Sequence, residues 1–318
     1  MTYDDKVLNG LIDLHLHLDG SLDIVMVRRL FEIDDISCDL SDDAIKNKLS
    51  VSEGCKDLNE YLEKFDFPCS LLQSEAQISE SVFMLKEKLK SQGLSYAEIR
   101  FAPQKHMDRG LDMEAVIEAA IDGNRRSDFP SGLILCLMRG DDNHEENIKT
   151  VKLAKKYLGT DVCAVDLAGA EALFPTEHFE DCFKLASNLD VPFTIHAGEA
   201  MGPSSIKKAI EFGALRIGHG VRAYEDETLM EELAKKNIFL ELCPTSNLNT
   251  SVFDDIKAYP IRKFLDYGIP ITVNTDNMSV SDTDIFKEYR LLSDAFELSD
   301  SEIEMIKSNS KKAAFKHL

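Results

Sequence analysis

The stretch Ile12-Asp13-Leu14-His15-Leu16-His17-Leu18-Asp19-Gly20 carries the strongest signal in the chain. It is a short apolar run that ends at a turn, which is typical of a buried strand. Side chains alternate between the two faces of a strand, so His15 and His17 point to the same side. Either a polar cluster at the strand end or a shared metal ion would explain such a pair. Later segments of the chain favour the metal ion.

The composition limits the class of protein and its partners. The chain has 318 residues, of which 44% are hydrophobic, enough for a large core. Its net charge of -21 repels phosphate backbones and anionic membranes, so we expect no nucleic acid and no membrane as partner. The 7 scattered cysteines and the absence of a signal-peptide pattern favour a reducing compartment. We therefore expect a cytoplasmic protein that acts on a small molecule.

Short β-rich segments alternate with helical patterns along the whole chain. We expect strands at 12–18, 96–102, 133–138, 163–167, 191–196, 216–218, 238–242 and 269–274. Such alternation predicts a parallel (β/α)8 TIM barrel, and a doubly wound open sheet is the alternative. No G-x-G-x-x-G follows the first strand, which disfavours a dinucleotide-binding version of that alternative. We expect a single domain over 1–318.

The interval between the first two predicted strands is far longer than one crossover requires. We expect extra helices there, forming a lid region at approximately 23–90. Leu58, Tyr61, Leu62 and Phe65 recur at i, i+3, i+4 and i+7, the spacing of one helix face. A stripe of this kind commonly faces a core. The alternative is an apolar lid over a site at the end of the first strand.

Polar residues gather where the predicted strands end, and a barrel brings these ends together on one face. The segments concerned are His15–Asp19, 166–169, 196–199, 218–220 and 274–277. His15, His17, His196 and Asp276 offer three nitrogens and one carboxylate, a set that suits one zinc ion with a further position for water. Zinc lowers the pKa of bound water from 15.7 to about 7, which makes a nucleophile available at neutral pH.

The remaining polar groups suggest roles around that ion. Asp276 could also accept the proton of the water, and His219 would stabilise charge or accept a proton. Glu199 lies three residues after His196, is not needed as a ligand, and is a natural general acid. Each residue alone has an ordinary explanation as a strand-end histidine, a helix-starting acid or a turn. Their coincidence at the strand ends favours an active site.

The same segments resemble the signature of the adenosine deaminase family, in its order and over nearly the whole chain. Each motif alone is weak, whereas the set is specific. Ala97–Pro103 also resembles the second strand of the family. The matching motifs are His15-Leu16-His17-Leu18-Asp19-Gly20-Ser21, Asp166-Leu167-Ala168-Gly169, His196-Ala197-Gly198-Glu199, Ile217-Gly218-His219-Gly220, Cys243-Pro244-Thr245-Ser246-Asn247 and Asn274-Thr275-Asp276.

This resemblance implies a barrel of the amidohydrolase type with one Zn²⁺ per subunit. It implies hydrolysis of adenosine and 2′-deoxyadenosine to inosine and deoxyinosine, with release of ammonia, as a step of purine salvage. The oligomeric state is left open. The resemblance places the metal on the four residues named above. It makes Glu199 the proton donor to purine N1 and puts His219 beside the attacking oxygen.

The resemblance also implies the substrate contacts. Asp19 matches the position that binds a ribose hydroxyl, and Gly169 the one whose N–H meets the purine. His17 faces the substrate as well, and the apolar lid over the base matches Leu58, Tyr61, Leu62 and Phe65. Asn277 stands where many members carry an aspartate that hydrogen-bonds purine N7. An amide N–H donates at any pH, so we expect binding to survive this change.

Several related readings compete with this one. Adenine deaminases usually carry glutamate at the position of Asp19, so Asp19 favours a nucleoside, while a deaminase of modified adenosines stays open. A non-catalytic binding protein would have lost Glu199 or a metal ligand. A binuclear hydrolase would need a lysine at the end of the fourth strand, which 166–169 lacks. The H-x-E and P-C-x-x-C motifs of the other nucleobase deaminases are also absent from the sequence.

Overall fold

The computed structural model describes residues 8–52 and 55–316. Within them, strands and helices alternate as the sequence predicts, and the strands lie within a few residues of the expected ranges. The strands are β1 (Ile12–His17), β2 (Tyr96–Phe101), β3 (Ser131–Met138), β4 (Val162–Ala168), β5 (Thr194–Ala197), β6 (Arg216–His219), β7 (Phe239–Leu242) and β8 (Ile271–Val273).

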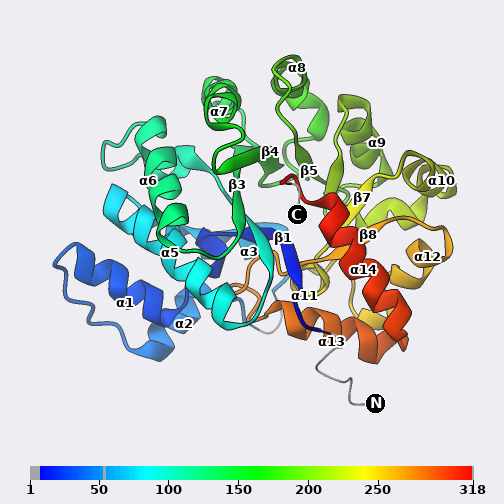
Figure 1. Ribbon diagram of the computed structural model, residues 1–318, viewed down its shortest axis with the longest axis horizontal. Helices are drawn as coiled ribbons and strands as arrows, with labels where there is room; N and C mark the ends of the chain where they lie inside the picture. Colours follow the sequence, from blue (N-terminus) through cyan, green and yellow to red (C-terminus); the bar gives the residue numbers. More distant parts are fainter. Residues whose placement is uncertain (1–7, 53–54, 317–318) are drawn as a thin grey trace.

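The strands pair in parallel in sequence order, as β1-β2-β3-β4 and β5-β6-β7-β8. Parallel bridges between Leu16 and Asp276 and between Val165 and Phe193 join these two sheets at both edges. The ring of strands is surrounded by helices (Figure 1). The prediction of a (β/α)8 barrel is therefore confirmed. The alternative of an open doubly wound sheet is wrong, because β1 pairs with the segment that follows β8.

The strands are buried on both faces, one toward the barrel interior and one toward the helices. In β4, for example, all 7 residues are buried. Continuous burial of this kind is typical of parallel sheets. The outer layer consists of α6 (Met113–Arg126), α7 (His144–Tyr157), α8 (Glu180–Asn188), α9 (Pro203–Phe212), α10 (Glu227–Lys236), α12 (Ile261–Asp266), α13 (Ile285–Phe296) and α14 (Asp300–Ala313). The 3₁₀ turn η4 (Thr176–Phe179) directly precedes α8.

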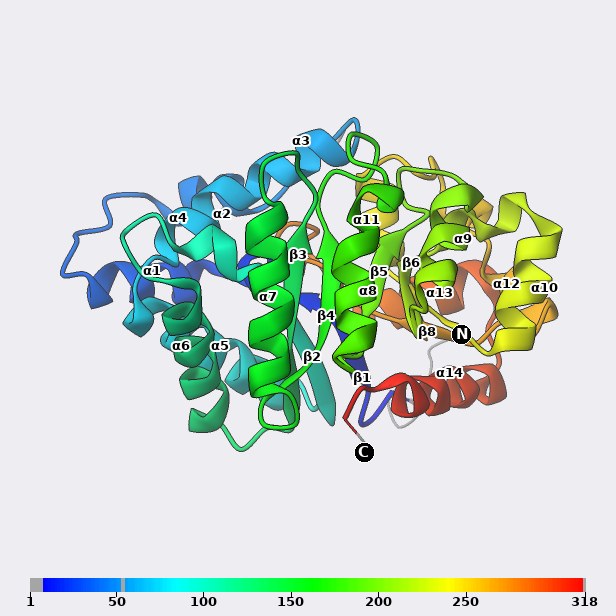
Figure 2. The same cartoon turned by 90° about the horizontal axis from the view of Figure 1, so that it is seen from above.

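The long interval after β1 contains several elements with different positions. They are η1 (Asp19–Ser21), α1 (Ile24–Ile33), α2 (Asp42–Leu49), α3 (Leu58–Leu62), η2 (Glu63–Phe65), α4 (Asp66–Leu71) and α5 (Glu75–Ser91). α5 packs against α6 as an ordinary crossover helix of the barrel. α3 instead lies at the end of the molecule to which the strands point (Figure 2). The part of the interval that covers the strand ends is thus shorter than 23–90.

The opposite end of the barrel is closed by the chain after α14. The Phe315 N–H donates to Glu98 at 2.7 Å, and Arg216 donates to the Ala313 carbonyl at 2.9 Å. The guanidinium of Arg216 also stacks on the Phe315 ring, 3.9 Å from its centroid. Among the described helices, none is both long and apolar enough to cross a bilayer. The cysteines in the described chain are free thiols, as predicted.

Candidate active site

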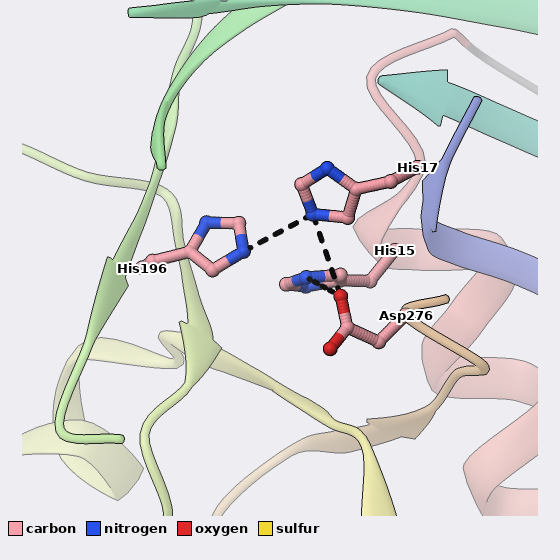
Figure 3. Close-up of side chains that lie close together, drawn as sticks. All are labelled: His15, His17, His196 and Asp276. Carbon is pink, nitrogen blue, oxygen red and sulfur yellow. Dashed lines mark hydrogen bonds and ion pairs between the residues drawn. The ribbon is translucent and has the colours of Figure 1, made fainter. Parts of the chain in front are cut away.

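The predicted metal-binding residues meet at the carboxyl end of the barrel (Figure 3). His15 and His17 belong to β1 and His196 to β5, whereas Asp276 follows β8. The Nε2 atoms of His17 and His196 are 3.3 Å apart. Asp276 Oδ1 is 3.4 Å from Nε2 of His15 and 3.4 Å from Nε2 of His17. Side chains from three distant segments therefore direct their donor atoms at one point.

The donor atoms of this cluster fit one divalent cation. His15 Nδ1 is 2.7 Å from Glu241 and His196 Nδ1 is 2.8 Å from Asp166, so both rings face a carboxylate with Nδ1 and turn Nε2 toward the cluster. His15 Nε2 is buried without a hydrogen-bond partner in the described part of the chain. Zn–N bonds of about 2.0–2.1 Å in a tetrahedron place two ligand atoms about 3.3 Å apart. Electron-rich atoms at the observed separations repel one another unless a proton or a metal cation lies between them, and one metal cation would serve all four donors at once.

A second layer of charges, which the sequence analysis missed, supports these histidines from below. Arg100 is fully buried and contacts Asp166 at 2.9 Å and Glu241 at 3.0 Å. Burial alone would raise the pKa of Asp166 and Glu241. The neighbouring arginines and histidines instead hold the pKa of both carboxyls well below the usual value. Both groups are thus carboxylates that orient His15 and His196.

Two residues of the site have backbone angles in the left-handed region. His219 has φ of 58° and Asp276 has φ of 60°, a conformation uncommon for residues other than glycine. Asp276 is held by its own N–H, which donates to the His15 carbonyl at 2.8 Å, and by its carbonyl, which accepts from the His17 N–H at 2.8 Å. Ser246 donates to Asp276 Oδ2 at 2.6 Å. Such strain persists only where surrounding contacts enforce it, and functional sites are common places for it.

Glu199 and His219 face each other beside this cluster. Glu199 Oε2 is 3.6 Å from His219 Nε2. Burial raises the pKa of Glu199 well above its usual value, and the negative charges of Asp276 and Glu171 raise it further. Burial also lowers the pKa of His219 well below its usual value. Burial thus favours the uncharged form of both groups, the protonated carboxyl of Glu199 and the neutral imidazole of His219.

Hydrogen bonds define which nitrogen of His219 carries the proton. The Tyr259 hydroxyl donates to Asn247 Oδ1 at 3.1 Å, so the Asn247 amide nitrogen faces His219. That nitrogen is 3.0 Å from His219 Nδ1, which must accept because the amide can only donate. The proton of the neutral ring therefore resides on Nε2, on the side of Glu199. Of the two roles considered for His219, this arrangement favours a donor that stabilises charge.

A pocket of about 480 Å³ opens above the cluster, within the usual range for small-molecule sites. All predicted site residues line it except His15, which is fully buried beneath. The sequence analysis did not anticipate several other residues of its wall, among them Asp66, Cys69, Lys105, Met138 and Arg139. Chemically, the pocket joins an acid, a neutral N–H donor and a candidate cation site.

The predicted apolar stripe forms one wall of this pocket. Leu58, Tyr61, Leu62 and Phe65 all line it, and the Phe65 ring centroid is 6.3 Å from that of His17. The stripe spans α3 and the 3₁₀ turn η2 rather than a continuous helix. The Tyr61 hydroxyl, which is buried, lies 2.8 Å from the Ser281 hydroxyl. This contact ties the stripe to the loop that follows β8.

The groups expected to contact the substrate also line the pocket. Burial raises the pKa of Asp19 to about 6, although the Cys69 thiol, 3.6 Å from Asp19 Oδ2, acts in the opposite direction. Asn277 Oδ1 is buried against Gly20, where a Cβ would come within 1.9 Å of it. The amide nitrogen of Asn277 is then the end available to the pocket. Gly169 has φ of 107°, which only glycine adopts readily.

Comparison with known proteins agrees with this geometry. The family model described as adenosine deaminase matches residues 11–317. The chain belongs to the adenosine deaminase family. An adenosine deaminase from Haemophilus ducreyi is 48% identical over 315 residues, covering 96% of this chain and 92% of the relative. The family assignment thus extends over the whole barrel and its lid segment.

Solved structures share the fold at lower identity. An adenine deaminase from Arthrobacter aurescens has a TM-score of 0.87 at 24% identity, covering 97% of this chain and 94% of its own. An amidohydrolase from Burkholderia ambifaria with bound Zn has a TM-score of 0.87 at 19% identity, covering 98% of this chain and 86% of its own. Both share the barrel fold of this chain.

Proposed function

We propose that the protein is a zinc-dependent enzyme that hydrolyses adenosine and 2′-deoxyadenosine to inosine and deoxyinosine, releasing ammonia. One observation carries this proposal. Glu199, whose burial favours the protonated carboxyl, and the Nε2–H of His219 face a pocket that opens above four donor atoms suited to a divalent cation. Together these three components can supply a nucleophile, a proton for the purine ring and a donor to the developing negative charge.

His15, His17, His196 and Asp276 would hold one Zn²⁺ per subunit. When bound, zinc would act as a Lewis acid and lower the pKa of a water molecule to about 7. The support for zinc is the nitrogen-rich donor set, together with the zinc in the related amidohydrolase of Burkholderia ambifaria. Asp276 would also accept the proton of the attacking water, since its second oxygen is already oriented by Ser246.

Glu199 would donate its proton to purine N1. Protonation there removes aromatic character from the N1–C6 bond and makes C6 electrophilic. A carboxyl with a raised pKa is suited to this task because burial favours its protonated form before the substrate arrives. His219 would then donate its Nε2–H to the negative charge that develops at the oxygen added to C6. Its orientation is fixed in advance by Asn247, so no reorganisation is needed.

The rest of the pocket would select a nucleoside. Asp19 would accept a hydrogen bond from a ribose hydroxyl, and the Gly169 N–H and Asn277 amide would donate hydrogen bonds to purine nitrogens. The lid stripe and His17 would enclose the base. The pocket wall also contains Asp66 and Asp108, which together with Asp19 outnumber the two cations of the wall, Lys105 and Arg139. This excess of negative charge disfavours a substrate with a 5′-phosphate. Separately, the free cysteines support a cytoplasmic location.

A substrate panel tests the proposal. The loss of the adenosine absorbance band is followed with adenosine, adenine and AMP at equal concentrations. We expect adenosine to exceed adenine by orders of magnitude in kcat/KM, because a site built for a hydroxyl rejects analogues lacking it by up to about 10⁴–10⁵. Equal efficiency on adenine, or preference for AMP, would contradict the nucleoside assignment.

A further inference from the structure

Glu171, which lies after β4, reaches the loop that carries Glu199. Its side chain is buried, with the residue 1% exposed. Its Oε1 accepts the Gly198 N–H at 2.8 Å. Its Oε2 accepts the N–H groups of Glu199 at 3.1 Å, Ala200 at 2.7 Å and Met201 at 2.9 Å. Four successive backbone N–H groups thus converge on one carboxylate.

A fifth donor comes from the helix that follows this loop. The Ser205 hydroxyl, in the first turn of α9, donates to Glu171 Oε1 at 2.5 Å. The loop can curl around the carboxylate because Gly198 adopts φ of 74°, a conformation that glycine tolerates. A larger residue would also clash here, since a Cβ would come within 2.4 Å of the Ile206 side chain. Successive N–H groups in such a curl form a concave anion site. Here the anion is a side chain of the protein itself.

The same loop projects the Glu199 carboxyl into the pocket. Gly198 and Ala200 flank Glu199, and both donate to Glu171, so the backbone is fixed on each side of the acid. On the pocket side, the Glu199 carboxyl has weaker support, a Thr250 hydroxyl at 3.4 Å. Arg222 Nε–H also donates to the Glu199 carbonyl at 3.0 Å, so Glu171 and Arg222 together hold the backbone that directs the Glu199 side chain.

We propose that Glu171 is a positioning residue, which acts on the reaction by fixing the loop from which Glu199 donates its proton. It does not line the pocket and touches no reacting atom. The inference rests on the proposed function, because it assigns Glu171 a role through the acid of that reaction. The negative charge of Glu171 also helps the acid, because it raises the pKa of Glu199 and so favours the protonated carboxyl.

Glu171→Gln is the direct test. Glutamine keeps the shape but has one acceptor oxygen, so either Gly198 or the three following N–H groups would face an NH₂ group. A displacement of about 1 Å at a reacting group can cost about 10²-fold, so we expect kcat to fall by about 10²-fold. Zinc content, KM and purine riboside affinity should stay close to wild type, since they depend on other residues. Glu177→Gln, at an exposed glutamate of the same segment, is the matched control.

A double-mutant cycle separates this role from general stabilisation of the fold. If Glu171 acts through Glu199, Glu171→Gln should cost little in a Glu199→Gln background, because the acid is already lost. If the fold-losses in kcat of the two single variants multiply in the double variant, or if kcat is unchanged in Glu171→Gln alone, the inference is overturned. Should Glu171→Gln not fold, Ser205→Ala leaves the carboxylate in place and removes only the hydroxyl that contacts Glu171 and Thr176. Its smaller loss should likewise vanish in the Glu199→Gln background.

The outcome for the wild type distinguishes the two proposals. A wild-type protein without activity on adenosine would contradict the proposed function. An active wild type combined with additive losses in the cycle would leave that function intact and contradict the role of Glu171 alone.

Discussion

Replacing Glu241 with glutamine keeps the shape of the side chain but removes one of its two acceptor oxygens. The wild-type carboxylate serves four donors in the barrel interior. Oε2 accepts from His15 Nδ1 at 2.7 Å and from Arg100 at 3.0 Å. Oε1 accepts from Thr194 at 2.9 Å and from Arg216 at 2.6 Å. The new NH₂ group must therefore face one of these two pairs of donors.

Both orientations weaken His15 as a ligand. If the NH₂ faces His15 Nδ1, the ring must move its proton to Nε2, the atom directed at the cluster. If it faces Arg216 instead, His15 keeps only a neutral amide oxygen, which supports the ring less than a carboxylate does. Loss of such a partner typically costs 10–100-fold in metal affinity, or about 1.4–2.7 kcal/mol. The free energy of unfolding should fall by about 3 kcal/mol, because a buried arginine then faces a neutral amide instead of a carboxylate.

The assay is competition for zinc between the protein and a chromophoric chelator, at a temperature where circular dichroism shows the variant to be folded. Glu211→Gln, at an exposed glutamate, is the control. We expect weaker zinc binding by Glu241→Gln and unchanged binding by the control. A folded Glu241→Gln protein with wild-type zinc affinity would refute the argument that this carboxylate supports the site.

Other variants test the remaining parts of the account. Glu199→Gln cannot transfer a proton, so kcat should fall by about 10⁴-fold while zinc and purine riboside still bind; near-normal turnover would show that another group protonates N1. Asp19→Ala should lower kcat/KM for adenosine far more than for adenine, and an unchanged ratio between the two substrates would remove Asp19 as the ribose anchor. Burial raises the pKa of Glu288 from 4.5 to about 7, so the folded state keeps a proton that the unfolded chain loses. The free energy of unfolding of the protein should therefore fall by up to about 3 kcal/mol as the pH rises from 4.5 to about 7. Glu288→Gln mimics the protonated form and should flatten that slope in urea melts, whereas an equal slope in both proteins would contradict the assignment.

The strand ends could be predicted from the sequence because the barrel makes them neighbours whatever the loops do. Once β and α segments alternate, His15, His196 and Asp276 must approach one another at the carboxyl end of the ring. Their roles as ligands stay a prediction, but their meeting did not require knowledge of any side-chain contact. The same reasoning brought Glu199 and His219 to this face.

The support beneath these residues could not be predicted, since it depends on which buried charges pair across the barrel. Glu98, Arg100, Arg216 and Glu241 each interrupt an apolar strand, and charges in buried strands must find partners. The sequence contains this signal but does not tell which partner each charge chooses. The contact of Glu241 with His15 joins residues 226 positions apart.

The lid shows a different limit of sequence reasoning. The spacing of Leu58, Tyr61, Leu62 and Phe65 correctly identified a shared face, and all four line the pocket. The spacing did not reveal that the helix gives way to a 3₁₀ turn after Leu62, because i and i+3 also share a face in that geometry. Likewise, periodicity alone could not separate α5, a crossover helix, from the segments that cover the site.

Zinc titration of the metal-free protein tests the central claim most directly. Adenosine turnover is followed as zinc is added, for the wild type and for His196→Ala. The account predicts no turnover without metal, a linear rise that saturates at one zinc per chain, and neither binding nor turnover in His196→Ala. Full activity in a rigorously metal-free preparation, or wild-type zinc binding by His196→Ala, would contradict it.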